Sequence, residues 1–178
     1  VASVIMFLAL HELSYDKYQK DADRIFIHYA HVAGTEKFFA YSPLVLAAEL
    51  RDKFPEIENI AQVRLLEGEL NLFHKNNFYK IDNGFLADAE ICKILSFSFI
   101  SGDEKSFRNK PNAVLLSHSM MEKYFPGKKD VIGSLIRIKH YSEEYLAEVA
   151  GIYEDVPENS QLRPEFLLNI QYYKDKNK

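Results

Sequence analysis

The first ten residues place the strongest constraint on the fold. Val1 to Leu10 reads VASVIMFLAL, with no charged residue. A helix needs about 20 apolar residues to cross a bilayer, so this run alone is too short to span one. It also lacks the basic flank and cleavage site of a signal peptide, and it opens on Val, which is typical of a fragment from inside a longer chain. Two interpretations stay open: a buried helix, or the end of a transmembrane helix.

Composition narrows the class of protein. The 178 residues are enough for one domain or for two lobes that share a boundary. The net charge is −4 and both signs are interspersed, so no nucleic-acid partner is expected. Cys92 is the single cysteine, which excludes an internal disulfide and a cysteine-built metal site. We expect it to be a small buried hydrophobe beside Ile91 and Ile94.

After His11 the pattern turns amphipathic and predicts that the first helix continues to about Lys20. Ser42 and Pro43 predict the N-cap and first residue of another helix, which Pro55 ends. Strands are predicted at 24–32, 38–41, 57–73, 78–81, 85–88, 113–116, 135–138 and 145–153. Turns are predicted at 33–35 and 76–77, and helices at 89–95 and 119–125. The residues after 170 are predicted to be solvated. We expect 135–138 and 145–153 to pair antiparallel. Irregular mixing of strands and helices is typical of the α+β class.

The sequence contains no clear metal-binding or nucleotide-binding motif. The seven glycines are scattered and form no phosphate-binding loop. His28 and His31 are three residues apart in a predicted strand, so they point to opposite faces and are not expected to share a metal. Asp21 and Asp23 begin like a calcium loop but lack the Gly and distal Glu of that motif. We predict no metal site and no cofactor in this chain.

Two further groups of residues contain side chains of the kinds that act in catalysis. Ser117 and Ser119 flank His118, but no GxSxG turn surrounds them, and helix capping accounts for both serines. Glu67 and Glu69 share one face of the predicted strand, which is the pattern of a charged exposed face more often than of paired acids. We therefore predict no catalytic residues, which favours binding, scaffolding or force transmission as the function.

Several segments, taken in order, carry a resemblance. They are Glu12 to Tyr18 (ELSYDKY), Asp21 to Phe26 (DADRIF), Ser42-Pro43, Phe54 to Asn59 (FPEIEN), Ile94 to Asp103 (ILSFSFISGD), Ala113 to Gly133 with KYFPG and VIG, Val149 to Tyr153 (VAGIY) and Asp155 to Ser160 (DVPENS). Each motif alone is weak, but their order and spacing resemble the periplasmic, MacB-like core domain of FtsX/MacB-family ABC transporter permeases of the Bacteroidetes type.

The resemblance implies a fold and a context. It implies the end of a transmembrane helix and its extension at 1–20, a porter-like strand-helix-strand lobe at 21–84 plus 154–178, and an inserted mixed α/β lobe at 85–153. The residues that it places in the membrane are Val4, Ile5, Met6, Phe7 and Leu8, with the exit at Leu10 to His11. It implies a domain on the periplasmic side of a bacterial inner membrane that transmits motion.

The partners that the resemblance implies are a cytoplasmic ABC ATPase subunit that binds ATP, a second permease copy in a dimer, and a periplasmic or outer-membrane partner. The chain is shorter around its turns than MacB itself and shows no outer-membrane docking feature, so macrolide efflux is not carried over. Two alternatives stay open. One is a membrane-tethered extracellular ligand-binding sensor domain, followed by a signalling module. The other is a small hydrolase or lyase whose site assembles only in three dimensions.

The membrane interpretation makes a prediction about the full-length gene product. About ten further apolar residues should precede Val1, because a span of roughly 20 is needed to cross the bilayer. Sequencing the complete reading frame checks this, and a charged or polar stretch before Val1 would refute the interpretation. Three more membrane spans after Lys178 favour a permease, whereas a signalling module there favours a sensor.

Overall fold

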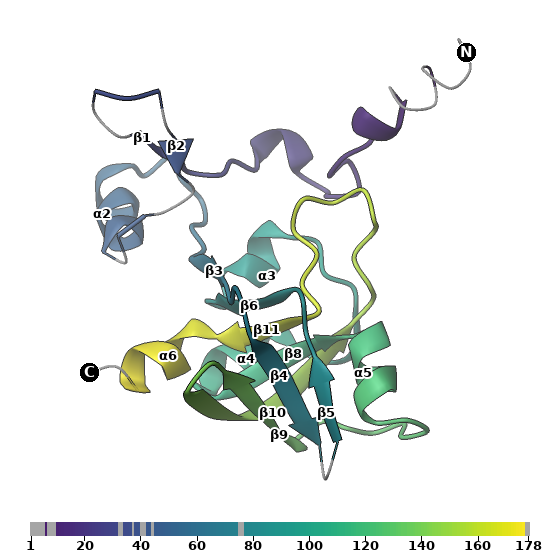
Figure 1. The fold of residues 1–178 in the computed structure, drawn as a ribbon. Helices are drawn as coiled ribbons and strands as arrows, with labels where there is room; N and C mark the ends of the chain where they lie inside the picture. The colour runs from purple at the N-terminus through teal and green to yellow at the C-terminus, as the bar shows by residue number, and fades with distance from the viewer. Residues whose placement is uncertain are drawn as a thin grey trace.

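The computed structural model describes residues 6, 10–31, 34–36, 38–39, 42–43, 45–74 and 77–176. Figure 1 shows one large mixed sheet with helices on its two faces and a smaller amino-terminal part beside it. In chain order the elements are η1 (Ala22–Arg24), β1 (Ala30–His31), β2 (Phe38–Phe39), α2 (Leu46–Lys53), β3 (Val63–Leu65), β4 (Leu70–His74), β5 (Asn77–Lys80), β6 (Gly84–Ala87), α3 (Ile91–Ile94), β7 (Phe99–Gly102), α4 (Glu104–Asn109), β8 (Ala113–Ser117), α5 (His118–Tyr124), β9 (Leu135–His140), β10 (Glu143–Tyr153), β11 (Phe166–Asn169) and α6 (Ile170–Lys176).

Among the described residues the large sheet runs β3-β6-β11-β8-β10-β9-β4-β5, and β7 also pairs with β10. The pairs β8 with β10 and β6 with β11 are parallel, whereas the other neighbours are antiparallel. The fold is therefore a mixed α/β fold built on a mixed sheet. The long β10 holds it together, because it pairs with β9 over its first half, with β7 over its last residues, and with β8 along the other edge.

The central strands are buried on both faces, which explains their unbroken apolar sequences. In β8, Val114 and Leu116 belong to one core cluster, whereas Ala113 and Leu115 belong to the other. Helices α5 and α6 contribute side chains to the first cluster, and α3 and α4 contribute Ile91 and Phe107 to the second. The outer strands β4, β5 and β9 bury only one face.

The predicted pairing of 135–138 with 145–153 is confirmed by β9 and β10, and the hairpin around residues 76–77 by β4 and β5. Asn76 itself lies outside the described residues, as do Val32 and Ala33 of the first predicted hairpin, which β1 and β2 form. β7 and α4 were not predicted. The Asp103 side chain caps α4 by accepting the Ser106 N–H at 2.6 Å.

Other sequence predictions were wrong in the amino-terminal part. Helix α2 begins at Leu46, and the Ser42 Oγ bonds the His28 ring at 2.7 Å instead of capping it. Residues 25–29 belong to no strand, and β1 starts only at Ala30. The end of the chain is also not fully solvated, because Tyr172 and Tyr173 of α6 pack on the core.

The predicted lobes do not coincide with a break in the sheet. Strands from 21–84 and 154–178 pair directly with strands from 85–153, as β6 and β8 do on the two edges of β11. The division into lobes stays a prediction.

The first helix ends at Glu12 and does not reach Lys20. Within the described ranges no helix is long and apolar enough to cross a bilayer. Met6 is helical and 63% exposed, whereas Val4, Ile5, Phe7 and Leu8 lie outside the described residues. Their membrane placement therefore stays a prediction.

Gly102 makes a position-specific prediction. Its φ is +71°, and a Cβ there would lie 2.1 Å from the Ala150 carbonyl oxygen, whereas Gly127 has a similar φ of +73° with nothing within 4 Å. Gly127→Ala should cost about 1 kcal/mol of unfolding free energy from backbone strain alone. Gly102→Ala should cost about 2 kcal/mol more, because backbone must move. Denaturant unfolding measures both, and equal losses would contradict the close packing of β7 on β10.

Candidate functional site

The amino-terminal segment leaves its first helix through a turn that its own polar side chains build. The Ser14 N–H and Oγ both donate to the His11 carbonyl, at 3.0 and 2.6 Å. A serine hydroxyl that bonds nearby backbone competes with helix continuation. Asp16 then adopts a φ of 56°, a left-handed conformation that Asp tolerates better than most residues. The turn explains why the helix stops before Lys20.

Asp16 binds a loop that is about 145 residues away in the sequence. Its N–H donates to the Asn159 carbonyl at 2.9 Å, and its Oδ1 accepts from the Ser160 Oγ at 2.7 Å and from the Gln161 N–H at 3.1 Å. Hydrogen bonds to a carboxylate are stronger than neutral ones. This one side chain therefore fixes the amino-terminal segment to the loop between β10 and β11, residues 154–165.

Further bonds surround this contact. The Asn159 Nδ2 donates to the carbonyl and the Oγ of Ser14, both at 3.0 Å, and the Tyr18 hydroxyl lies 3.2 Å from the Ser160 Oγ. Burial raises the pKa of Tyr18 and outweighs the opposing hydrogen bond from Ser160, so the neutral phenol is favoured. Ser160 is only 4% exposed. The buried Ser160 hydroxyl is thus hydrogen-bonded, which avoids the free-energy cost of burying a polar group without a partner.

A second contact fixes the same segment to another loop. The buried Gln19 accepts the Ser96 N–H at 2.7 Å, and the Lys20 N–H donates to the Ser96 Oγ at 3.1 Å. We call the two contacts together the amino-terminal junction. It consists of Ser14, Asp16, Tyr18, Gln19, Lys20, Ser96, Asn159, Ser160 and Gln161. Figure 1 shows loop 154–165 in yellow-green reaching the purple amino-terminal segment.

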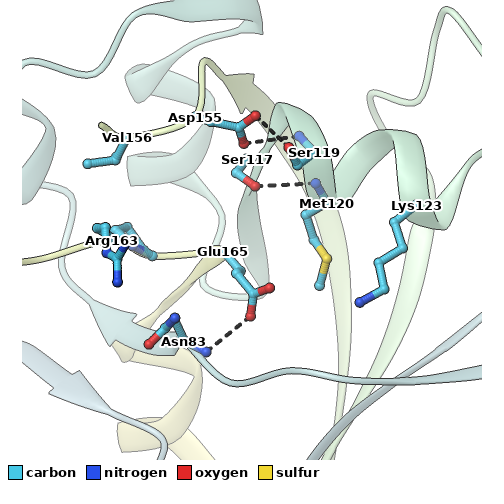
Figure 2. Close-up of a pocket in the computed structure, with 10 residues that line it drawn as sticks. Asn83, Ser117, Ser119, Met120, Lys123, Asp155, Val156, Arg163 and Glu165 are labelled. Atoms are coloured by element: carbon cyan, nitrogen blue, oxygen red, sulfur yellow. Dashed lines mark hydrogen bonds between the residues drawn. The ribbon is translucent and has the colours of Figure 1, made fainter. Parts of the chain in front are cut away.

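The start of loop 154–165 is bound to helix α5. Asp155 accepts the Ser119 N–H at 3.0 Å and the Ser119 Oγ at 2.6 Å (Figure 2). Partial loss of solvent would raise the pKa of Asp155, but the hydrogen bonds from Ser119 and Ser117 outweigh it and hold the pKa below its ordinary value. The anion is therefore the favoured form, and it satisfies an N–H of the first helical turn.

The end of the loop is bound to β8 and to residues 82–83, which precede β6. The Glu165 carboxylate accepts the N–H groups of Asp82 and Asn83 at 3.0 and 3.1 Å, and its carbonyl accepts the Ser117 N–H at 2.9 Å. The buried Tyr153 hydroxyl donates to the Pro164 carbonyl at 2.8 Å. The loop is thus bonded at its start to α5, at its end to β8 and to the turn before β6, and in its middle to the amino-terminal segment.

A hollow of about 260 Å³ opens beside the loop, where Figure 2 shows Lys123 and Arg163 on either side of Glu165. Its hydroxyls and carboxylates already serve structural bonds. Ser119 bonds Asp155, Glu165 accepts from residues 82 and 83, and Ser117 caps α5 by accepting the Met120 N–H at 3.3 Å. The predicted cap is confirmed for Ser117 and wrong for Ser119, whose hydroxyl binds Asp155.

The structure does not bring the catalytic candidates together. His118 is exposed and is not part of the hollow's lining. Glu67 and Glu69 are exposed, as predicted, and lie at the β9–β10 hairpin, where their carbonyls accept from the His140 ring and the Tyr141 N–H. Glu67 and Glu69 therefore do not come together with Ser117 in one site.

The other candidates also occupy structural positions. His31 bonds the Thr35 carbonyl at 2.6 Å within its hairpin, whereas His28 bonds Ser42. Asp21 precedes η1 without a side-chain cap bond. Cys92 is partly buried against the second core cluster, and burial raises the pKa of its thiol to about 12, which confirms the prediction of a packing role.

The junction itself was not predicted. Two of the segments that carry the family resemblance, Glu12 to Tyr18 and Asp155 to Ser160, supply most of its residues. Nothing in the linear sequence pairs two polar segments that are about 145 residues apart, so their partnership emerges only from the fold.

The junction makes a prediction about stability. Asp16→Ala removes a charged acceptor and should cost about 1–3 kcal/mol, with faster hydrogen exchange at the Gln161 amide. Asp16→Asn should cost less, because asparagine keeps an oxygen acceptor and tolerates the same φ. Asp21→Ala is the matched control, since Asp21 is exposed and forms no cap bond. Equal behaviour of Asp16→Ala and Asp21→Ala would show that the junction contributes nothing.

Comparisons with known proteins agree on this architecture. The family described as the MacB-like periplasmic core domain matches residues 1–177. A domain of a protein assigned as a permease, from Porphyromonas gingivalis, is 23% identical with a TM-score of 0.57, covering 71% of this chain and 57% of the other. The extracellular domain of the noncanonic ABC-type transporter YknZ from Gram-positive bacteria is 14% identical with a TM-score of 0.52, covering 74% and 63%.

The periplasmic region of MacB from Actinobacillus actinomycetemcomitans is 13% identical with a TM-score of 0.51, covering 74% of this chain and 57% of the other. Comparison with curated proteins gives no match. The chain thus spans less than two thirds of each of these solved domains, and at these identities they show the fold alone. The match of the family over nearly every residue shows more: the chain belongs to the MacB-like periplasmic core domain family.

Proposed function

We propose that this chain is the extracytoplasmic domain of an ABC transporter permease subunit, and that it transmits ATP-driven motion to a substrate or partner outside the membrane. Family membership supports the transporter context. The amino-terminal junction is the observation that carries the mechanical role, because it joins the segment that follows the apolar run to the sheet through several hydrogen bonds.

Motion would pass through bonded elements. A displacement of Asp16 would move loop 154–165. The first part of this loop is bonded to α5 through Asp155, and its last part is bonded through Glu165 to β8 and to the turn before β6. A physical path for coupling needs such a chain of packed and hydrogen-bonded groups. The Ser96 contact adds a second point of attachment, so that the segment cannot pivot freely about Asp16.

The rest of the machine lies outside this chain in the proposal. ATP binds a cytoplasmic ABC ATPase subunit, and a second permease copy completes the transporter in the bacterial inner membrane, with this domain on the periplasmic side. The domain needs no catalytic residues, because it acts by moving. Export, or the handling of a lipoprotein or peptide with a periplasmic or outer-membrane partner, fits this role.

The test uses the full-length permease with its ATPase in lipid vesicles. A fluorophore is attached at Glu122→Cys, an exposed position of α5, with an acceptor in the lipid headgroups. Cys92 should stay unlabelled, because burial raises the pKa of its thiol to about 12. ATP should change the energy transfer, and Asp16→Ala with Asn159→Ala should reduce that change at least about twofold while ATP hydrolysis continues.

The control pair Asp21→Ala with Glu158→Ala removes one exposed side chain from each of the same two regions. It should leave the signal unchanged. An ATP response that survives the loss of Asp16 and Asn159 would refute transmission through the junction. A wild-type transporter without any ATP response would refute the transmission role altogether.

A further inference from the structure

Among the described residues, no element covers the outer face of β5, β4, β9 and the first half of β10, residues 143–148. The opposite face of these strands carries Leu72, Ile138 and Tyr145, which are fully buried in the core. Strand alternation then sends the intervening side chains outward. We call these residues the open face: Asn71, Phe73, Phe78, Lys80, Leu135, Arg137, Lys139, Glu144, Leu146 and Glu148.

The open face combines apolar groups with charges of both signs. Phe78, Leu135 and Leu146 are 68%, 56% and 50% exposed. Phe73 lies 6.3 Å from Phe78 between ring centroids, and the Arg137 guanidinium lies 5.0 Å above the Phe73 ring. Large exposed apolar side chains that gather on one face typically mark an interaction surface.

The strand register sets the order of these side chains across the sheet. One row runs Phe78, Phe73, Arg137 and Leu146, from β5 to β10. The apolar ends are thus separated by an aromatic ring and a cation. A two-fold axis parallel to the strands, between β4 and β9, would place β5 of one copy over β10 of another. Phe78 would then face Leu146, and Phe73 would face Arg137, which is a favourable cation–π pair.

The next row obeys the same symmetry. It runs Lys80, Asn71, Lys139 and Glu144 in the same strand order. Under the two-fold axis, Lys80 would face Glu144 of the second copy, and Asn71 would face Lys139. Opposite charges therefore meet at both ends of the row and like charges do not. An isologous interface requires such self-complementarity of a single surface.

We propose that the open face binds the open face of a second copy of this chain, with the sheets packed face to face. The strand register and the chemistry of this face support such a contact independently of the proposed function. Ten residues per copy are fewer than the 20–30 of a standard stable interface, so the isolated chains should associate weakly and reversibly.

Sedimentation of the chain over about 10 µM to 1 mM is the first test. We expect a monomer–dimer equilibrium. Lys80→Glu and Glu144→Lys should each weaken the dimer about tenfold, because every dimer then contains two like-charge contacts. The double variant should recover to within about threefold of wild type, since the two opposite-charge contacts return with reversed sign.

A monomer at all concentrations would overturn the proposal. So would a dimer that neither single swap weakens, because that dimer would use another surface, such as the exposed Phe26 and Ile27. A double variant no better than the single ones would also overturn it.

A second variant is independent of charge. The double variant Lys80→Cys, Glu144→Cys places two cysteines three strand spacings apart in one copy. This distance between the two positions, about 14 Å, is too long for a disulfide. Sheets packed face to face are about 10 Å apart, which is also too far for a direct disulfide, so a bifunctional thiol reagent that spans about 8 Å is added. It should give a covalent dimer linked at these positions, whereas each single-cysteine variant should give little. Failure of the double-cysteine variant to cross-link would contradict the proposed arrangement.

Discussion

The Asp16 carboxylate accepts hydrogen bonds from Ser160 and Gln161, and the relation of the amino-terminal segment to the sheet depends on this contact. The contact joins two segments that are about 145 residues apart in the sequence. The backbone turn that places the Asp16 side chain there needs the left-handed conformation of Asp16 itself. The charge matters because hydrogen bonds from a buried hydroxyl and a backbone N–H to a carboxylate are stronger than hydrogen bonds to a neutral acceptor. In the proposed function, these polar residues form the mechanical connection between the amino-terminal segment and the sheet.

In the proposed function, the sheet is the stiff body that this connection would move. Its central strands β11, β8 and β10 bury side chains on both faces, so a local displacement at loop 154–165 is resisted by two packed core clusters. The amino-terminal part around α2 differs, because no residue of that helix is buried. An eight-residue helix without a buried face is marginal by itself. Stiffness is thus concentrated where the junction attaches.

The sequence predicted the sheet better than the junction. Apolar runs such as Ala113 to Leu116, and the alternation in Leu135 to Ile138, identify strands because burial periodicity is a local property. Helix ends were predicted less well. The Ser14 hydroxyl bonds the His11 carbonyl where the first helix was predicted to continue, and the Ser42 hydroxyl bonds His28 instead of capping a helix. The contacts of Asp16 and Gln19 depend on loops far away in sequence, so no local pattern encodes them. The family resemblance marked these segments without indicating that they touch.

Hydrogen exchange at the Gln161 amide in the full-length permease, with and without ATP, tests the central claim most directly. This N–H donates to Asp16, so it reports whether the junction is closed. If the junction transmits motion as a rigid connection, the amide should stay protected to the same degree in both states while the domain moves. Loss of its protection in the ATP-bound state, with the sheet amides still protected, would show that the junction opens and would contradict the account.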